Sequence, residues 1–492
     1  HDIYYNVQDF SFSNIDKFSG SSIVTRLTSD VANIQMAFQM MIRMAIRCPV
    51  MLVLALFSAA RISLKLSLIY CVALPLLALV IFCLIPTVFK IFDKVFKTYD
   101  SLNNVVQENI HGIRVVKSFV REDKEIEKFS GISGEIYRLF GKAEHIIALN
   151  SPVMQFTMYM CILAISWLGA HMIAAHSLTT GQLMSLFTYV MNILMSLMML
   201  SMVFVMITMS VASARRVSEV LNEKSNLNNP KHPVMEVKDG SITFDHVTFS
   251  YKEDAAEPVL SDINLSIHSG ETIGILGGTG SSKSSLVNLI SRLYDVNEGS
   301  VSVGGIDVRK YDLDTLRNQV AVVLQKNVLF SGTILDNLRW GDKNATEEEC
   351  IRACKLACAD DFINTFPDKY NTYIEQGGTN VSGGQKQRLC IARALLKKPK
   401  ILILDDSTSA VDTATDAKIR KAFAEEIPNT TKLIIAQRIS SVMNADRIIV
   451  LNNGVVDGFG SHEELMETNA IYREVYESQT QGSGDFDEGG AA

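Results

Sequence analysis

Charged side chains are absent from one long part of this sequence. No Asp, Glu, Lys or Arg occurs between Glu144 and Arg215. A soluble domain seldom continues that far without a charged residue, because its surface has to remain polar. Hydrophobic residues make up 48% of the chain and lie mainly before about residue 215. The missing charge therefore argues against a large soluble helical core and favours a membrane-embedded first half.

Basic clusters and paired cysteines are missing as well. The net charge is −7, and without a block of Lys and Arg no nucleic-acid partner is expected. Of the eight cysteines, Cys350, Cys354 and Cys358 repeat every four residues and so share one helix face. This spacing favours small buried residues over a zinc site, and the absence of a disulfide framework fits a reducing compartment. The chain opens at His1 with neither an initiator methionine nor a signal sequence, so we expect a fragment.

Four apolar segments reach or nearly reach the roughly 20 residues that a helix needs to cross a bilayer. They comprise about residues 44–60, 66–89, 146–175 and 183–209. Residues 90–143 carry ten Lys or Arg, which places this segment in the cytoplasm by the positive-inside rule, although Arg61 and Lys65 then fall outside. The second helix should continue to about Asn109 and project into the cytoplasm. We therefore assign residues 1–215 to a transmembrane domain with cytoplasmic loops.

The composition changes after residue 215. Residues 216–237 are polar and contain two prolines, which indicates a linker. Residues 238–478 alternate short apolar runs with helical patterns, which is typical of an α/β domain whose mostly parallel sheet is covered by helices. We expect strands at residues 272–276, 320–324, 401–404, 432–436 and 447–451. Residues 479–492 are acidic and Gly-rich, so a disordered tail is expected.

A glycine-rich loop follows the first of these strands and precedes a helical pattern. The backbone N–H groups of such a loop, the helix dipole and the Lys283 charge together form a phosphate site. The pattern G-x-x-x-x-G-K-[ST] requires a glycine where this chain has Ser282, so a chance turn remains the alternative for the loop taken alone. The residues expected to bind ATP here are Gly277, Gly278, Thr279, Gly280, Ser281, Ser282, Lys283, Ser284 and Ser285.

Two further motifs lie downstream of the glycine loop. Asp405 ends the buried strand 401–404, and it would hold Mg²⁺ beside Ser284 so that the metal bridges the phosphates. A second helix N-terminus able to bind an anion carries Val381, Ser382, Gly383, Gly384 and Gln385. One domain does not need two anion-binding sites for one phosphate. We infer that the glycine loop and the segment 381–385 each bind a nucleotide that is shared with a second domain.

In combination these motifs resemble those of the ABC exporters of the multidrug and lipid type, and the resemblance covers residues 1–478. The segment 277–284 is similar to the Walker A loop, 401–405 to Walker B and 381–385 to the signature. By the same resemblance, Gln325 would be the Q-loop residue, acting with the catalytic groups and at the Mg²⁺. Tyr251 would stack on adenine, 409–412 would be the D-loop and 375–378 would couple the cassette to the membrane domain.

The resemblance also describes the membrane domain. The family has six membrane helices in each subunit, and this sequence contains four, so two more are expected to precede it. Residues 13–18 and 112–129 resemble the two cytoplasmic coupling segments. The implied fold class is an α-helical transmembrane domain of the ABC exporter type followed by an α/β P-loop nucleotide-binding domain. The implied location is the bacterial plasma membrane, with the cassette in the cytoplasm.

Two residues depart from the family pattern at the catalytic positions. The family's catalytic base is a Glu directly after Walker B, where this chain has Asp406, and its switch His is here Gln437. The signature is intact. The resemblance therefore implies the degenerate-site subunit of a heterodimer: its own ATP site is slow or inactive, and its signature completes the site of a second ABC half-transporter. A fully active homodimer and a regulatory or ATP-gated channel on the same scaffold are the alternatives. The implied cargo is apolar or amphipathic.

Overall fold

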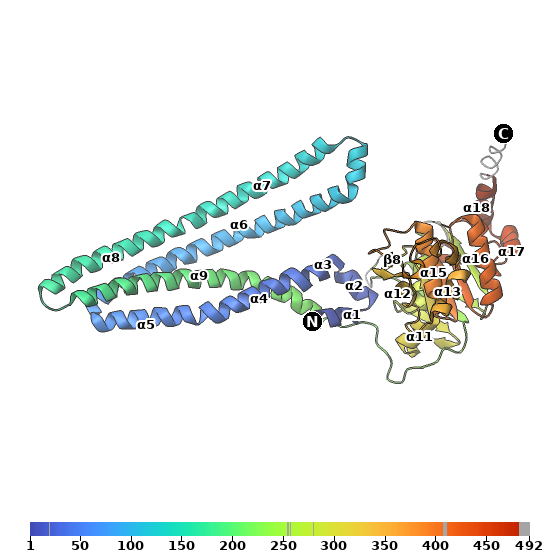
Figure 1. Ribbon diagram of the computed structural model, residues 1–492, viewed down its shortest axis with the longest axis horizontal. Coiled ribbons are helices and arrows are strands. Elements are labelled where there is room, and N and C mark those ends of the chain that lie inside the picture. The colour runs from blue at the N-terminus through green and yellow to red at the C-terminus, as the bar shows by residue number, and fades with distance from the viewer. Residues whose placement is uncertain (19, 253–254, 256, 279, 407–410, 482–492) are drawn as a thin grey trace. The chain divides into compact units, whose positions relative to one another are not determined.

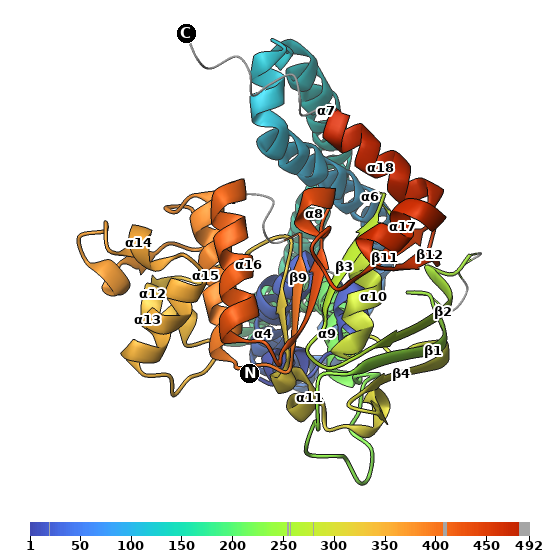
Figure 2. The same cartoon turned by 90° about the vertical axis from the view of Figure 1, so that its right-hand side faces the viewer.

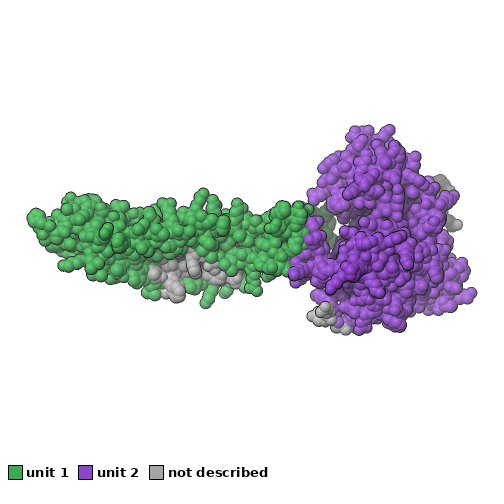
Figure 3. Space-filling view, turned by 90° about the horizontal axis from the view of Figure 1, so that it is seen from below, with its two compact units in different colours: residues 1–6, 20–222 green, residues 7–19, 223–492 purple. Residues whose placement is uncertain are grey.

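The computed structural model describes residues 1–18, 20–252, 255, 257–278, 280–406 and 411–481. The chain divides into two compact units (Figure 3). Unit 1 comprises residues 1–6 and 20–222, and unit 2 comprises residues 7–19 and 223–492. Unit 1 is helical, and unit 2 is an α/β domain, so the predicted fold class is confirmed.

Unit 1 consists of long helices that lie alongside one another (Figure 1). Helix α6 packs against α7, and α5 packs against α9. Two π-helical segments, η1 and η2, interrupt the first of these long runs. The elements are α1 (Asp2–Gln8), α3 (Gly20–Thr25), η1 (Arg26–Asp30), α4 (Val31–Met40), η2 (Met41–Ala45), α5 (Arg47–Ile62), α6 (Leu64–Ser118), α7 (Glu122–Ala148), α8 (Asn150–Ala174) and α9 (Thr180–Asn222).

Three of the described helical stretches are long and apolar enough to cross a membrane: Ser22–Ile62, Glu122–Ala174 and Thr180–Leu200. They correspond to the first, third and fourth predicted spans. The second predicted span, 66–89, lies within α6, where Leu64–Leu77 forms a shorter apolar stretch. Several side chains in the rest of that span lie outside the described part of the chain. Helix α6 continues to Ser118 rather than to Asn109. The predicted coupling segment 112–129 comprises the end of α6, the turn at residues 119–121 and the start of α7.

The predicted linker begins later than its polar composition suggested. Helix α9 includes residues 216–222, which were assigned to the linker. The reason is that two charged side chains in α9 have partners on the first helical segment. Arg216 donates from Nε to Oδ2 of Asp30 at 2.8 Å, and Glu219 pairs with Arg26 at 3.4 Å. Asp30 is only 1% exposed. These polar residues hold α9 against its neighbour and therefore do not end the helix.

The main sheet of unit 2 has the strand order β12-β11-β3-β10-β9-β6. All five predicted strands are present, and they are the five parallel strands of this sheet. Ile435 is paired with Ile275 on one side and with Asp405 on the other, so β3, β10 and β9 end at the same edge. The bounds are β3 (Thr272–Gly277), β6 (Val320–Val323), β9 (Ile401–Asp405), β10 (Thr431–Ile435), β11 (Arg447–Asn452) and β12 (Val455–Gly460).

Different layers cover the two faces of this sheet (Figure 2). Leu402 and Leu404 pack with α15 (Gly383–Leu396) and α16 (Thr413–Glu426). Ile401 and Ile403 pack with α10 (Lys283–Ile290) and with a second, antiparallel sheet. That sheet was not predicted from the sequence, and it contains β1 (Ile242–Phe249), β2 (Leu260–Ile267), β4 (Glu298–Val303) and β5 (Ile306–Asp307). Sheet and helices together bury the parallel strands on both faces.

Shorter elements complete unit 2. Helices α13 and α15 lie on the same side of the main sheet. Helix α18 includes residues 479–481, which were assigned to the disordered tail, and the remainder of the predicted tail lies outside the described residues. The remaining elements are α2 (Phe12–Phe18), η3 (Val308–Lys310), α11 (Leu313–Gln319), β7 (Gly332–Thr333), α12 (Ile334–Leu338), α13 (Glu347–Leu356), α14 (Asp360–Ile363), η4 (Lys369–Asn371), β8 (Tyr373–Ile374), η5 (Ile439–Ser441), α17 (His462–Thr468) and α18 (Ala470–Gln481).

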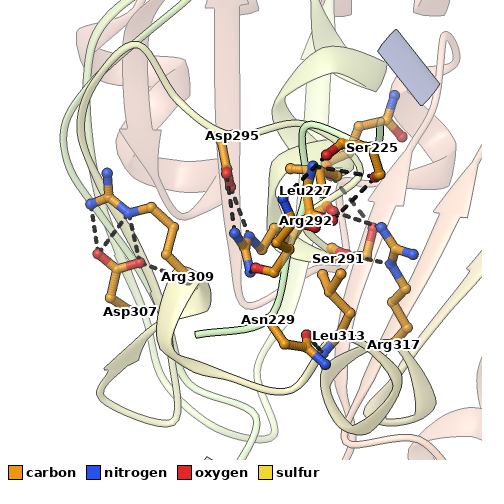
Figure 4. A network of polar contacts seen from close by, with 12 residues as sticks. Ser225, Leu227, Asn229, Ser291, Arg292, Asp295, Asp307, Arg309, Leu313 and Arg317 are labelled. Carbon is orange, nitrogen blue, oxygen red and sulfur yellow. Dashed lines mark hydrogen bonds and ion pairs between the residues drawn. The ribbon is translucent and has the colours of Figure 1, made fainter. Parts of the chain in front are cut away.

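The segment after α9 is bound to the cassette by a polar network (Figure 4). Arg292, 5% exposed, donates from Nε to Asp295 at 2.8 Å and from Nη1 to the carbonyl oxygen of Asn228 at 3.4 Å. The backbone N–H of Leu313 donates to Oδ1 of Asn229 at 2.9 Å. The predicted linker is therefore anchored along the surface of the α/β domain.

We predict that Arg292→Ala lowers the thermal unfolding midpoint of the cassette by about 4–8 °C. A buried charged hydrogen-bond donor contributes about 2 kcal/mol, and each kcal/mol corresponds to about 2–4 °C in a domain of this size. Arg352→Ala is the matched control, because the Arg352 side chain is 74% exposed and pairs at the surface with Glu426, which is 45% exposed. Thermal unfolding followed in detergent gives the comparison. Equal shifts from the two variants would contradict the role assigned to Arg292.

Candidate functional site

The glycine loop lies between β3 and α10, so its strand–loop–helix context is as predicted. Lys283 donates from Nζ to the carbonyl oxygens of Gly277 at 2.8 Å and Gly278 at 2.7 Å, and to Ser281 Oγ at 3.2 Å. Burial lowers the pKa of Lys283, and the neighbouring Asp405 and Asp406 oppose that shift. Thr279 lies outside the described residues. The loop therefore folds around one cation at the start of a helix.

Ser282 occupies a backbone conformation that favours glycine. Its φ is +70° and its ψ is 23°, which is the left-handed region. A residue with a Cβ atom is disfavoured there by roughly 1–2 kcal/mol. The Ser282 side chain makes no capping hydrogen bond to α10 that would offset this strain. The departure from the glycine pattern thus has a local energetic cost in this structure.

Asp405 and Ser284 form the second part of the site. Ser284 donates from Oγ to Oδ2 of Asp405 at 2.7 Å. Asp405 is 8% exposed, and its pKa is raised first by burial and then by the Asp406 charge, against the effects of Ser284 and Lys283. A carboxylate and a hydroxyl oxygen that face each other are suitable ligands for a hard divalent cation. Of the residues expected to bind Mg²⁺, Ser284 and Asp405 therefore have suitable oxygen donor atoms that lie close together.

Asp406 brings together residues that are far apart in the sequence. Its backbone has a φ of +46°, and its N–H donates to the carbonyl oxygen of Ile435 at 3.0 Å. Its Oδ2 atom accepts hydrogen bonds from Nε2 of Gln325 at 3.3 Å and from Nε2 of Gln437 at 3.1 Å. The three residues predicted at the catalytic position therefore lie together, and the carboxylate is held by two neutral amides.

One contributor to this cluster was missed by the sequence analysis. Gln387, on α15, is 2% exposed and donates from Nε2 to the carbonyl oxygen of Asp406 at 3.3 Å. A buried glutamine within an otherwise apolar helix face is a signal that could have identified it. Through this bond the helix that begins at the signature contacts the turn that carries Asp406.

Tyr251 lies on an aromatic surface beside α10. Its hydroxyl is 2.8 Å from Ser285 Oγ, and its ring meets Tyr294 edge to face with 5.0 Å between centroids. Tyr294, which the sequence analysis also missed, donates from its hydroxyl to Oδ2 of Asp16 at 2.8 Å. Burial, followed by the contact with Asp16, raises the pKa of Tyr294. Asp16 is on α2, the helix at the position of the first predicted coupling segment and a part of unit 2.

The signature segment forms a helix start on the other side of the sheet. Ser382 caps α15: its Oγ accepts from Gln385 N at 3.3 Å, and its N–H donates to Gln385 Oε1 at 2.9 Å. Helix α15 packs on the face of the sheet opposite α10, which follows the glycine loop. Lys386 donates to Gly377 in the segment 375–378 at 2.6 Å. Of the predicted D-loop 409–412, residues 409 and 410 lie outside the described part of the chain.

These features define a class of protein. A phosphate loop, a carboxylate at the end of the adjacent strand and a second capped helix start are combined in one α/β domain that follows membrane-spanning helices. This is the organisation of an ATP-driven transporter with both domains in one chain. Two family models match: one described as ABC transporter, at residues 260–409, and one described as ABC transporter transmembrane region, at residues 1–198.

Known relatives cover nearly the whole chain. The uncharacterized ABC transporter ATP-binding protein YfiB of Bacillus subtilis is 36% identical over 477 residues, which are 97% of this chain and 82% of that protein. The ATP-dependent lipid A-core flippase of Desulfotalea psychrophila is 34% identical over 478 residues, 97% of this chain and 83% of that protein. The chain belongs to the ABC transporters, in the half-transporter form with a membrane domain fused to an ATP-binding domain.

A solved structure supports the fold. The structure of a bacterial Atm1-family ABC exporter with ATP bound superposes with a TM-score of 0.85 and covers 97% of this chain and 84% of the other, at 24% identity. The exporter fold is thus shared over almost the whole length. The match of residues 1–198 to the ABC transporter transmembrane region, together with the apolar helices, makes the chain an integral membrane protein with a cytoplasmic cassette. With residues 216–222 moved from the linker to α9, our proposed domain limits are 1–222, 223–237 and 238–478.

We predict that Ser282→Gly raises the thermal unfolding midpoint of the cassette by about 2–4 °C. Glycine removes roughly 1 kcal/mol of left-handed strain, and no capping bond is lost. Ser282→Ala is the control: it retains the Cβ atom, so no gain is expected. Unfolding curves of the three proteins provide the measurement. A gain from alanine equal to that from glycine would show that backbone strain is not the cause.

Proposed function

We propose that this chain is one subunit of a heterodimeric ABC exporter. Its own nucleotide site holds ATP with slow or no turnover, and its signature, 381–385, completes the hydrolytic site of a second half-transporter. The observation that supports this most directly is the environment of Asp406, whose carboxylate accepts hydrogen bonds from the amides of Gln325 and Gln437. Neither amide can take up a proton at neutral pH.

The geometry of a general base also favours slow turnover. Asp is one methylene shorter than Glu, so its carboxylate is set back by about 1 Å, enough to misplace an attacking water. The bonds to Gln325, which follows β6, and to Gln437, which follows β10, hold the Asp406 carboxylate between the ends of these two strands rather than leaving it free to extend. Gln437 occupies the position where the family has a histidine. Its neutral amide can donate a hydrogen bond to a phosphate, but it cannot take up or release a proton at neutral pH.

The same site has the groups needed to bind ATP. Lys283 would exchange its loop carbonyl partners for phosphate oxygens, and Tyr251 would stack on the adenine. Ser284, Asp405 and Gln325 would hold Mg²⁺, whose charge would neutralise the phosphates. The remaining loop residues would donate backbone N–H groups. Binding and hydrolysis therefore depend on different residues in this proposal.

We propose an apolar or amphipathic cargo that is moved outward across a bacterial plasma membrane. The relative in Desulfotalea psychrophila is named a lipid A-core flippase, which supports an amphipathic cargo. The methionine-rich face of α9 supports the same class, because Met191, Met195, Met198 and Met202 are all exposed in this single chain. Thioether side chains adapt to varied apolar surfaces.

We predict opposite sensitivities for two substitutions in the assembled transporter. Ser382→Ala removes the hydroxyl and the helix cap presented to the partner's nucleotide, so ATPase activity should fall about tenfold or more. Asp406→Asn alters a site with little turnover of its own and should change the rate less than twofold. ATP hydrolysis in proteoliposomes measures both. Equal losses would argue for a homodimer with two active sites.

The double variant Asp406→Glu/Gln437→His should increase hydrolysis by the site of this chain. The longer carboxylate can reach a water, and the imidazole can exchange a proton near neutral pH, which together contribute about 10²-fold or more in suitable geometry. Phosphate release is measured for the assembled transporter in nanodiscs, because the partner completes the site of this chain, with Asp406→Glu/Gln437→Asn as the control. If the unmodified chain alone already hydrolyses ATP rapidly, the homodimeric exporter is the better assignment.

A further inference from the structure

The last turn of α18 contacts the backbone on both sides of residue 438. Gln479 donates from Nε2 to the carbonyl oxygen of Gln437 at 2.9 Å. Its Oε1 atom accepts from the N–H of Ile439 at 2.8 Å. One side-chain amide thus satisfies an acceptor and a donor two residues apart, as a neighbouring strand would. This pairing fixes the path of the chain between β10 and η5.

The same turn carries the side chain that contacts Asp406. Gln437 donates from Nε2 to Oδ2 of Asp406 at 3.1 Å, while its own carbonyl oxygen is held by Gln479. Ala436 is already tied to the sheet, since its N–H donates to Ile275 at 3.3 Å. The orientation of Gln437 is therefore set from one side by the sheet and from the other by α18.

Helix α18 is a firm support for this contact. Tyr472 is fully buried, its N–H donates to Asn469 Oδ1 at 2.7 Å, and its hydroxyl lies 2.7 Å from His462 Nδ1. Val475 and Tyr476, one turn further on, pack against the core on the α15 side of the sheet. Gln479 follows in the next turn. A side chain that is placed by a packed helix can hold a loop more exactly than one placed by another loop.

We propose that Gln479 is a positioning residue for the nucleotide site, acting through Gln437. This inference rests on the proposed function, in which Gln437 occupies the switch position beside the terminal phosphate. A glutamine is required because it must donate to one backbone group and accept from another. A glutamate at this position keeps the acceptor for Ile439 but loses the donor to Gln437. The C-terminal helix thereby takes part in holding ATP.

A double-mutant cycle on nucleotide release tests this role. In the purified chain in nanodiscs, Gln479→Ala should speed the release of mant-ATP with Mg²⁺ by about three- to tenfold, the effect of one or two hydrogen bonds. Gln479→Ala should change release less than about 1.5-fold when Gln437→Ala is already present, because residues that act as a unit are not additive. Glu477→Ala, exposed on the same helix, is the control and should leave release unchanged. Effects of Gln479→Ala and Gln437→Ala that multiply would overturn the proposal.

Hydrogen exchange at the Ile439 amide separates a local effect from unfolding. Protection should be lost in Gln479→Ala and retained in Gln479→Glu, since only the glutamate keeps the acceptor. Loss of protection across β10 in either variant would show a general structural role and would also overturn the proposal. Phosphate release is recorded in the same samples. Rapid hydrolysis would contradict the slow site of the proposed function, whereas the cycle would still decide whether Gln479 acts through Gln437.

Discussion

Parallel pairing of β10 with both β3 and β9 is the constraint on which the site depends. Because Ile435 is in register with Ile275 and with Asp405, three chain segments leave the sheet at the same edge. Strand β3 continues into the glycine loop, β10 into the turn with Gln437, and β9 into Asp406. Parallel strands bind ligands at this carboxyl edge since their connecting loops converge there. No single loop contains the site.

The parts of the fold that could be predicted are those with a strong local signal. Residues 401–404 form a continuous apolar run that ends in Asp405, and the strand is buried along its whole length. By contrast, β1 and β2 have eight residues each, but their buried and exposed residues alternate irregularly and their pairing shifts register, so they lack the continuous apolar run that marks the parallel strands. The start of the linker was predicted too early for a different reason. Arg216 and Glu219 pair with charged residues of another helix, but in the sequence they have the same polar character as linker residues.

The same distinction applies to the site. Lys283, Ser284 and Asp405 could be predicted because their spacing and strand context specify a phosphate site. Tyr294 and Gln479 could not, because each acts through contacts with residues that are distant in the sequence and belongs to no motif. Gln387 has only the weaker signal of a polar residue on an apolar helix face. A glutamine at the end of an amphipathic helix is ordinarily a solvated residue. Gln479 can bind the backbone of Gln437 and Ile439 only because the turn after β10 passes beside the end of α18.

Retention and turnover can be separated in this site because they use different chemistry. Retaining an anion requires fixed positive and dipolar groups, which the loop around Lys283 and the start of α10 supply. Turnover requires a group that can take up a proton at the right distance, and the Gln325 and Gln437 amides that donate to the Asp406 carboxylate cannot do so. The backbone strain at Ser282 affects the glycine loop, which would retain the nucleotide. Asp406 and Gln437 lie at the edge of the sheet and affect the catalytic position. A chain can therefore lose catalytic geometry at this edge while the glycine loop still holds nucleotide, provided that α15 keeps its cap at Ser382 for a partner.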